Sequence, residues 1–246
     1  MFKSHAISRI MKGGETMKTL VLVLALTAVV GGACVAETAS FDVYAGWNNV
    51  ALPIVPFNPD PEAVFANAPQ GIDGLLTRWD PSSGGITYDA LDPDAFGKCL
   101  LGDGYWLQCW SGATISFDGV PDGVPDNAGN KTDMWISLPG NQNTNSGAWH
   151  HIGHPFNHDT PVDDGSGVGT NILFTDGTVM LNWATASAPP YNWVDTYMTG
   201  WNPASGGFYV QFDGLGDDDH LRVGNGYWIK TYKANLAMII LANATD

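Results

Sequence analysis

The chain has 246 residues, with 10 Lys and Arg against 25 Asp and Glu, so its formal net charge is −15 at pH 7. This acidic balance argues against proteins that bind nucleic acids or anionic membranes, because both functions need basic patches. The acids are scattered among Gly, Pro and aromatic residues rather than clustered in runs, which predicts a folded chain and not a disordered one.

The N-terminal segment has the features of a secretory signal peptide. Met17 is followed by a lysine, an apolar stretch at 20–30 and then small residues, which predicts cleavage after Ala36. The apolar stretch is shorter than the roughly 20 residues of a membrane-spanning helix, so we expect no membrane span in the mature chain. We expect translation to start at Met17, with residues 1–16 assigned to the protein in error, and the mature protein to be secreted.

Two segments of the mature chain occur twice. Residues 78–110 align with 200–232 at an offset of 122 without a gap, and they share Trp-x-Pro-x-Ser-Gly-Gly and Gly-x-Gly-Tyr-Trp. Upstream, GWNNVALPIVP at 46–56 aligns with AWHHIGHPFNH at 148–158 at an offset of 102. Self-similarity of this kind indicates an internal duplication.

The duplication divides the mature chain into homologous units. The first unit is expected at 37–118 and the second at 134–246, joined by an Asp/Gly/Pro-rich linker at 119–133. Aromatic and β-branched runs bounded by Gly, Pro, Asn and Asp predict strands in both units. The second unit carries an inserted hairpin at 171–181, whose Asp-Gly pair predicts a type I′ turn. The expected fold is all-β, with two tandem antiparallel units that are sandwich- or barrel-like.

The GWN…LP strand and the later GYW strand also carry a resemblance. They resemble the units of secreted bacterial β-repeat proteins of unestablished role, which often occur as appendages of cell-surface or extracellular proteins. The resemblance covers most of residues 41–241 and implies a two-unit β architecture. It implies no particular activity.

The repeated Gly-Tyr-Trp strand has two distinct faces. Because side chains alternate along a strand, Tyr105, Leu107 and Cys109 share one face, which we expect to be the core side. The other face mixes aromatic and polar residues. Its rings either pack under a loop or against the sister unit, or they lie exposed and stack on a ligand. The candidate ligand-binding residues are Trp106, Trp110, Trp228 and Tyr232.

A histidine cluster distinguishes the second unit from the first. HHIGHPFNHD contains His150, His154 and His158 and is followed by Asp159, whereas the matching first-unit stretch has no histidine. Neutral imidazole is a common ligand of zinc, so these four residues are candidate metal ligands. On a straight strand His150 and His154 would lie about 13 Å apart, so the chain must bend for them to converge. The alternative is a set of histidines that form hydrogen bonds to loops.

The linker contains a second candidate metal site. DGVPDGVPDN resembles the Asp-rich calcium loops of thrombospondin type 3 repeats, and this resemblance implies Asp118, Asp122 and Asp126 as oxygen ligands of Ca²⁺. The alternative is a plain Asp/Pro linker. Cys99 and Cys109 either form a disulfide or are small buried apolar residues, and the second interpretation is preferred.

The sequence favours a non-enzymatic role. It contains no Gly-x-Ser-x-Gly nucleophile elbow and no Gly-rich phosphate loop before a helix. We therefore expect a structural or binding protein of the bacterial cell surface or extracellular matrix, with a surface polysaccharide or another extracellular protein as its partner. The alternatives are a carbohydrate-binding module that uses exposed aromatic faces, and a metal-dependent hydrolase centred on the histidines of 150–158.

Overall fold

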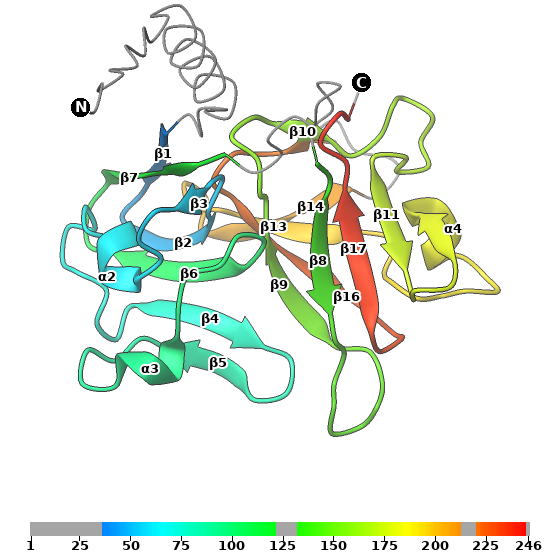
Figure 1. The fold of residues 1–246 in the computed structure, drawn as a ribbon, viewed down its shortest axis with the longest axis horizontal. Coiled ribbons are helices and arrows are strands. Elements are labelled where there is room, and N and C mark those ends of the chain that lie inside the picture. The colour runs from blue at the N-terminus through cyan, green and yellow to red at the C-terminus, as the bar shows by residue number, and fades with distance from the viewer. Residues whose placement is uncertain (1–35, 122–131, 213–219, 245–246) are drawn as a thin grey trace, which may run out of the picture. The chain divides into compact units, whose positions relative to one another are not determined.

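The computed structural model describes residues 36–121, 132–212 and 220–244, and these residues form an all-β fold (Figure 1). The all-β prediction is therefore confirmed. The strands form open antiparallel sheets, none of which closes on itself among the described residues. No helix in the described part of the chain is long and apolar enough to cross a membrane.

Residues 36–121, called here the first half, contain two sheets. The smaller sheet has the strand order β1-β7-β3 and the larger has the order β2-β6-β4-β5. Two short helices, each with Pro at its first position, connect the strands. The elements are β1 (Glu37–Val43), β2 (Gly46–Ala51), β3 (Val55–Pro56), α2 (Pro61–Val64), β4 (Leu76–Asp80), β5 (Gly84–Thr87), α3 (Pro93–Phe96), β6 (Gly104–Cys109) and β7 (Ala113–Val120).

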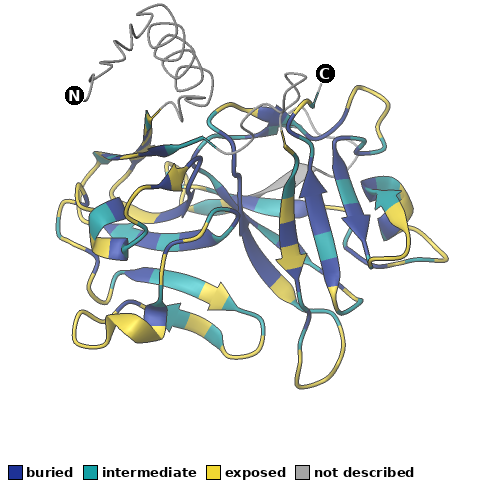
Figure 2. Ribbon diagram, in the orientation of Figure 1, coloured by how far each residue is buried: buried dark blue, intermediate teal, exposed yellow. Residues whose placement is uncertain are grey.

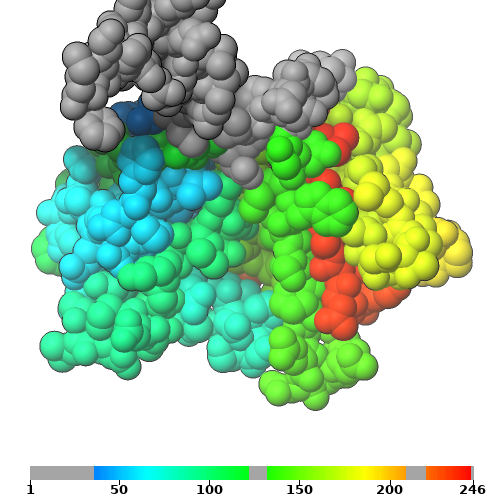
Figure 3. Space-filling view, viewed as in Figure 1, coloured from blue at the N-terminus to red at the C-terminus, as the bar shows by residue number. Residues whose placement is uncertain are grey.

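The described residues from 132 to 244, called the second half, contain two four-stranded sheets and one two-stranded sheet. The four-stranded sheets have the orders β12-β11-β17-β8 and β14-β13-β16-β9, and β10 pairs with β15. Figure 3 shows β8 in green beside β17 in red. The elements are β8 (Met134–Leu138), β9 (Trp149–Gly153), β10 (Thr160–Pro161), β11 (Ile172–Thr175), β12 (Met180–Asn182), α4 (Trp183–Ser187), β13 (Met198–Asn202), β14 (Gly207–Phe212), β15 (His220–Leu221), β16 (Gly226–Lys230) and β17 (Leu236–Ile240).

The larger sheets of the two halves have the same strand order. Strands β2, β6, β4 and β5 correspond in sequence to β9, β16, β13 and β14, and each set is arranged in that order. In the same way, β1 pairs with β7 as β8 pairs with β17. The duplication stays a prediction, and this shared order supports it.

Each half has a hydrophobic core of its own. One cluster of buried residues lies between Ala39 and Phe117, and a second lies between Ile136 and Ala242. The predicted core face of the Gly-Tyr-Trp strand is buried in both halves, with Tyr105 and Tyr227 fully buried. In Figure 2, β9 and β17 are dark blue along most of their length because their side chains are buried on both sheet faces.

Two local features differ from the sequence expectations. The inserted hairpin exists, but Thr175 pairs with Met180, so its loop has four residues rather than a two-residue Asp-Gly turn. The Asp176 carboxylate accepts hydrogen bonds from the backbone N–H groups of Thr178 and Val179, which stabilises the longer loop. Strand β7 continues to Val120, two residues past the expected end of the first unit.

Candidate functional site

The two halves meet through the outer faces of their larger sheets, the faces turned away from the two cores. The Ala51 N–H donates to the Gly224 carbonyl, and the Gly153 N–H donates to the Gly102 carbonyl, both at 2.8 Å. Position 51 aligns with 153, and position 102 aligns with 224. Each half therefore donates one of these bonds and accepts the other, at matching positions. The interface is therefore reciprocal, like that of a two-fold dimer within one chain.

Tryptophan side chains repeat this reciprocity. The Trp79 indole Nε1 donates to the Trp149 carbonyl at 2.8 Å, and the Trp201 Nε1 donates to the Trp47 carbonyl at 2.7 Å. Position 79 aligns with 201, and 47 aligns with 149, so the same bond is made twice in opposite directions. Each bond satisfies the polar end of an indole and leaves its apolar face available for packing.

The ring packing across the interface is also reciprocal. The ring centroids of Trp106 and Trp201 are 5.3 Å apart, and those of Trp79 and Trp228 are 5.2 Å apart, both edge to face. Phe208 packs against Trp106 at 6.0 Å and has no aromatic counterpart, because Ile86 occupies the matching position. Rings of the two halves are therefore in direct contact at two matching places along the interface.

Two clefts are hollowed between these rings. The first cleft has a volume of about 340 Å³ and the second a volume of about 430 Å³. Each cleft is lined by residues of both halves, with one tryptophan contributed by the opposite half. The first cleft is lined by Trp47, Thr77, Trp106 and Trp201. The second cleft is lined by Trp79, Trp149, Thr199, Phe208 and Trp228.

The glycines of the two Gly-Tyr-Trp motifs permit this close approach. A Cβ added at Gly226 would lie 2.1 Å from Oδ1 of Asn49, and one added at Gly104 would lie 2.5 Å from Cδ2 of His151. Contacts this short do not occur in folded proteins, so a Cβ at either position would force Asn49 or His151 to move. The motif is thus part of the interface between the halves.

Asn49 and His151 occupy matching positions and meet at the centre of this interface. The Nε2 of His151 forms a hydrogen bond with Oδ1 of Asn49, and its ring stacks on Trp228 at 4.5 Å with an interplanar angle of 2°. Burial lowers the pKa of His151 to about 3, so the imidazole is neutral at neutral pH. Because the amide oxygen can only accept, the His151 Nε2 carries the proton in this pair.

The four aromatic residues suggested by the sequence divide into two pairs. Trp106 and Trp228 line the clefts and pack against tryptophans of the opposite half. Trp110 and Tyr232 lie just beyond the strands, 76 % and 49 % exposed, and line neither cleft. The Tyr232 hydroxyl donates to Asp195 at 2.7 Å.

Sequence reasoning missed most of the cleft residues. The signal was present, because two tryptophans outside the core pattern recur at matching positions of the two repeats. The missed aromatic residues are Trp47, Trp79, Trp149, Trp201 and Phe208.

The candidate zinc ligands have other partners in the structure. His150 forms a hydrogen bond with the Thr231 hydroxyl at 3.1 Å, and His154 donates from Nε2 to the His158 carbonyl at 2.7 Å. The Asp159 carboxylate accepts from the Arg222 guanidinium. Burial lowers the pKa of both His150 and His154 to about 4. Within residues 36–121, 132–212 and 220–244, no three His, Cys, Asp or Glu side chains are grouped so that they could hold a metal ion.

The candidate calcium ligands are only partly within the described residues. Asp118 lies in β7, where its carboxylate accepts a hydrogen bond from the Thr38 hydroxyl at 2.6 Å. Asp122 and Asp126 lie outside the described residues. Cys99 and Cys109 are free buried thiols, and burial raises the pKa of Cys99 to about 12, so its thiol is neutral.

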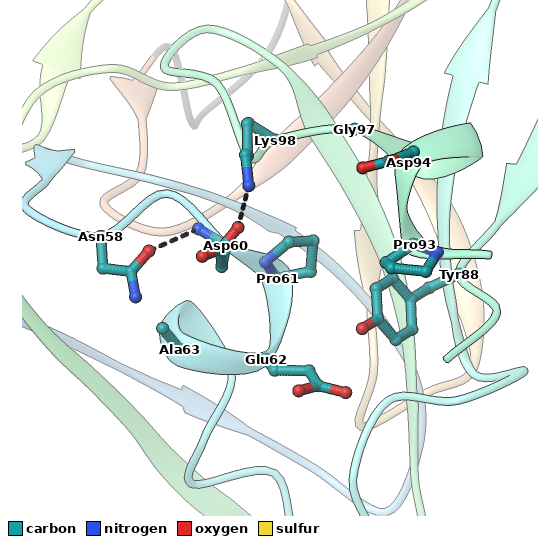
Figure 4. A pocket seen from close by; sticks show the side chains of 10 residues that line it. All are labelled: Asn58, Asp60, Pro61, Glu62, Ala63, Tyr88, Pro93, Asp94, Gly97 and Lys98. Atoms are coloured by element: carbon teal, nitrogen blue, oxygen red, sulfur yellow. Dashed lines mark hydrogen bonds and ion pairs between the residues drawn. The ribbon is translucent and has the colours of Figure 1, made fainter. Parts of the chain in front are cut away.

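A third hollow lies between α2 and α3 in the first half (Figure 4). It has a volume of about 330 Å³ and a mixed polar and apolar lining that includes Asn58, Pro61, Pro93 and Asp94. Two of its charged groups neutralise each other. Asp60 forms an ion pair with Lys98. Burial, followed by a hydrogen bond with Glu62, raises the pKa of Tyr88.

The fold and the clefts define an all-β protein with two exposed aromatic clefts between paired sheets. Comparison with family models, with curated proteins and with solved structures finds no match to the chain.

Proposed function

We propose that the chain is a secreted, non-enzymatic binding protein of the bacterial cell surface or extracellular matrix, and that its two clefts hold carbohydrate. The observation that carries this proposal is the exposure of the cleft tryptophans. Trp47 is 44 % exposed and Trp149 is 42 % exposed. The strands that carry these two residues are held in place by the backbone hydrogen bonds that Ala51 and Gly153 donate to the opposite half. Apolar surface held rigidly in a concave site is typical of ligand-binding sites.

The chemistry of the clefts suits sugar rings. A pyranose presents an apolar C–H face that packs on an indole, while its hydroxyl groups project at the edge of the ring. Thr77 and Thr199 stand at matching positions in the two clefts and can exchange hydrogen bonds with such hydroxyls. A chain with two clefts of related composition suits a polymeric saccharide, because one polymer presents several sugars to the two clefts.

The proposal is tested by titrating the mature chain with oligosaccharides of five or six sugars from several β-linked polysaccharides. Binding is measured by calorimetry and by tryptophan fluorescence. Trp47→Ala and Trp149→Ala each remove one exposed cleft ring, and we expect each to weaken binding at its own cleft by about tenfold or more. Trp135→Ala is the control, because Trp135 is 56 % exposed on β8 and lines neither cleft.

Binding that survives both cleft substitutions would contradict the assignment of the site. If no saccharide binds while an extended Pro-rich peptide does, the partner is an extracellular protein instead, because aromatic-lined grooves also accept polyproline segments.

A further inference from the structure

The two clefts differ in charge at one matching position. Lys230 in β16 aligns with Gln108 in β6, and both residues lie on the outer sheet face. Lys230 pairs across the ladder with Trp149, and Gln108 pairs with Trp47. Besides the threonine that lines each cleft, a second polar side chain therefore lies beside its exposed tryptophan. That side chain is cationic at the second cleft and neutral at the first.

The Lys230 ammonium is held against aromatic rings. Its Nζ lies 5.7 Å from the Trp149 ring centroid and 4.9 Å from the Tyr232 ring centroid. Trp149 lines the second cleft, so the charge stands beside that cleft. Cation–π contacts position an ammonium without using up its three N–H donors, which stay available to an acceptor.

Three other described cations are already neutralised by carboxylates. Lys98 pairs with Asp60, Lys233 with Asp176, and Arg222 with Asp159. Among the described residues no carboxylate lies within ion-pair distance of Lys230. The neighbouring Asp195 carboxylate accepts the Tyr232 hydroxyl instead.

We propose that the second cleft binds a saccharide bearing a carboxylate, such as a uronic acid, and that Lys230 pairs with this group while the sugar ring packs on Trp149. This inference rests on the proposed function and adds the chemical class of the ligand. By the same reasoning the first cleft takes an uncharged sugar, because Gln108 offers an amide and no charge. An acidic heteropolysaccharide with both kinds of sugar fits the pair of clefts.

The negative charge of the whole chain opposes a polyanion only at long range. At 0.15 M salt the Debye length is about 8 Å, so distant carboxylates on the protein are largely screened while a direct contact with Lys230 is not. Selectivity for the carboxylate at moderate salt therefore reports the local contact.

The test uses oligogalacturonides and the same oligosaccharides after reduction of each carboxylate to a primary alcohol. The mature chain is titrated with both at 0.15 M and 0.5 M salt. We expect the carboxylate form to bind about threefold to tenfold more tightly at 0.15 M, with a smaller preference at 0.5 M. Lys230→Gln copies the residue of the first cleft and should remove the preference. Gln108→Lys copies the second cleft and should increase it. Thermal unfolding of both variants checks that they are folded.

The outcomes separate the two proposals. A carboxylate preference that is lost in Lys230→Gln supports the inference. Equal binding of both forms by the wild type, or a preference that Lys230→Gln retains, overturns the inference and leaves saccharide binding in place. If neither these sugars nor the wider oligosaccharide set binds, the proposed function itself fails.

Discussion

A single added methyl group at Gly226 should destabilise the interface between the two halves. In a Gly226→Ala variant the new Cβ would lie 2.1 Å from Oδ1 of Asn49 and 3.1 Å from Nε2 of His151. Ordinary van der Waals contacts lie near about 3.5 Å, so the Asn49 amide must move by more than about 1 Å and its hydrogen bond with His151 is lost. Overpacking costs about 1–3 kcal/mol, and a buried polar group left unpaired costs a similar amount. We expect a total loss of about 3 kcal/mol, which lowers the Tm of a chain of this size by about 6–12 °C.

The assay is thermal and urea unfolding followed by circular dichroism, with two comparisons. Gly207→Ala is the control, because a Cβ there meets nothing closer than the Ser205 hydroxyl at 3.7 Å, and it should leave the Tm unchanged or slightly higher. In an Asn49→Ala background the cost of Gly226→Ala should shrink, since the clashing amide is gone. Equal Tm values for Gly226→Ala and Gly207→Ala would refute the argument that this glycine permits close approach of the halves.

Two further predictions concern pH. His150, His151 and His154 have pKa values lowered by burial to about 4, 3 and 4, so the unfolded chain binds protons below pH 6.5 that the folded chain does not. The free energy of unfolding should fall as the pH drops from 6.5 towards 4, by on the order of 3 kcal/mol for each histidine. A double variant with His150→Asn and His151→Asn should therefore unfold at a lower pH than the wild type. Unfolding curves collected from about pH 7 to 3 measure this shift, and an unchanged midpoint would contradict it. Burial raises the pKa of Asp103 to about 6, so its contribution has the opposite sign and stability is lost as the pH rises from 4 to 6. Asn225 occupies the matching position of the second half. Asp103→Asn should therefore stabilise the protein at about pH 7.5 by on the order of 2 kcal/mol and have little effect at about pH 4. The same gain at both pH values would show that charge is not the cause.

Local sequence patterns predicted the strands and their buried faces. Alternation placed Tyr105 and Leu107 in the core, and the offset of 122 identified their counterparts in the second half. These predictions succeed because the period of a strand and the burial of one face are local properties. The four-residue hairpin loop was not predicted, because the Asp176 side chain caps backbone N–H groups and so favours a longer loop than Asp-Gly alone suggests.

The clefts could not be derived in the same way. They depend on the angle at which two sheets cross, and no residue pattern along one strand encodes that angle. Trp106 and Trp228 were identified because they lie in the Gly-Tyr-Trp motif. Trp79 and Trp201 were missed, because each packs against a tryptophan of the opposite half that is distant in the sequence. Recurrence of a tryptophan outside the core pattern was the available signal.

The histidines were interpreted as candidate ligands because the first half lacks them. In the structure, the neighbouring His151, which was not among the candidate ligands, faces its matching residue Asn49 across the interface. A difference between matching positions of the two halves can therefore reflect a contact between the halves as well as a new site.

The pairing of Asn49 with His151 also distinguishes this interface from that of a dimer of identical subunits. On the axis of a dimer of identical subunits each residue meets its own copy, so such a dimer would place asparagine against asparagine or histidine against histidine. The tandem chain escapes this restriction, and one position has become the hydrogen-bond donor while the other is the acceptor. A single chain can therefore carry different side chains at the two matching positions of a two-fold interface, whereas a dimer of identical subunits cannot.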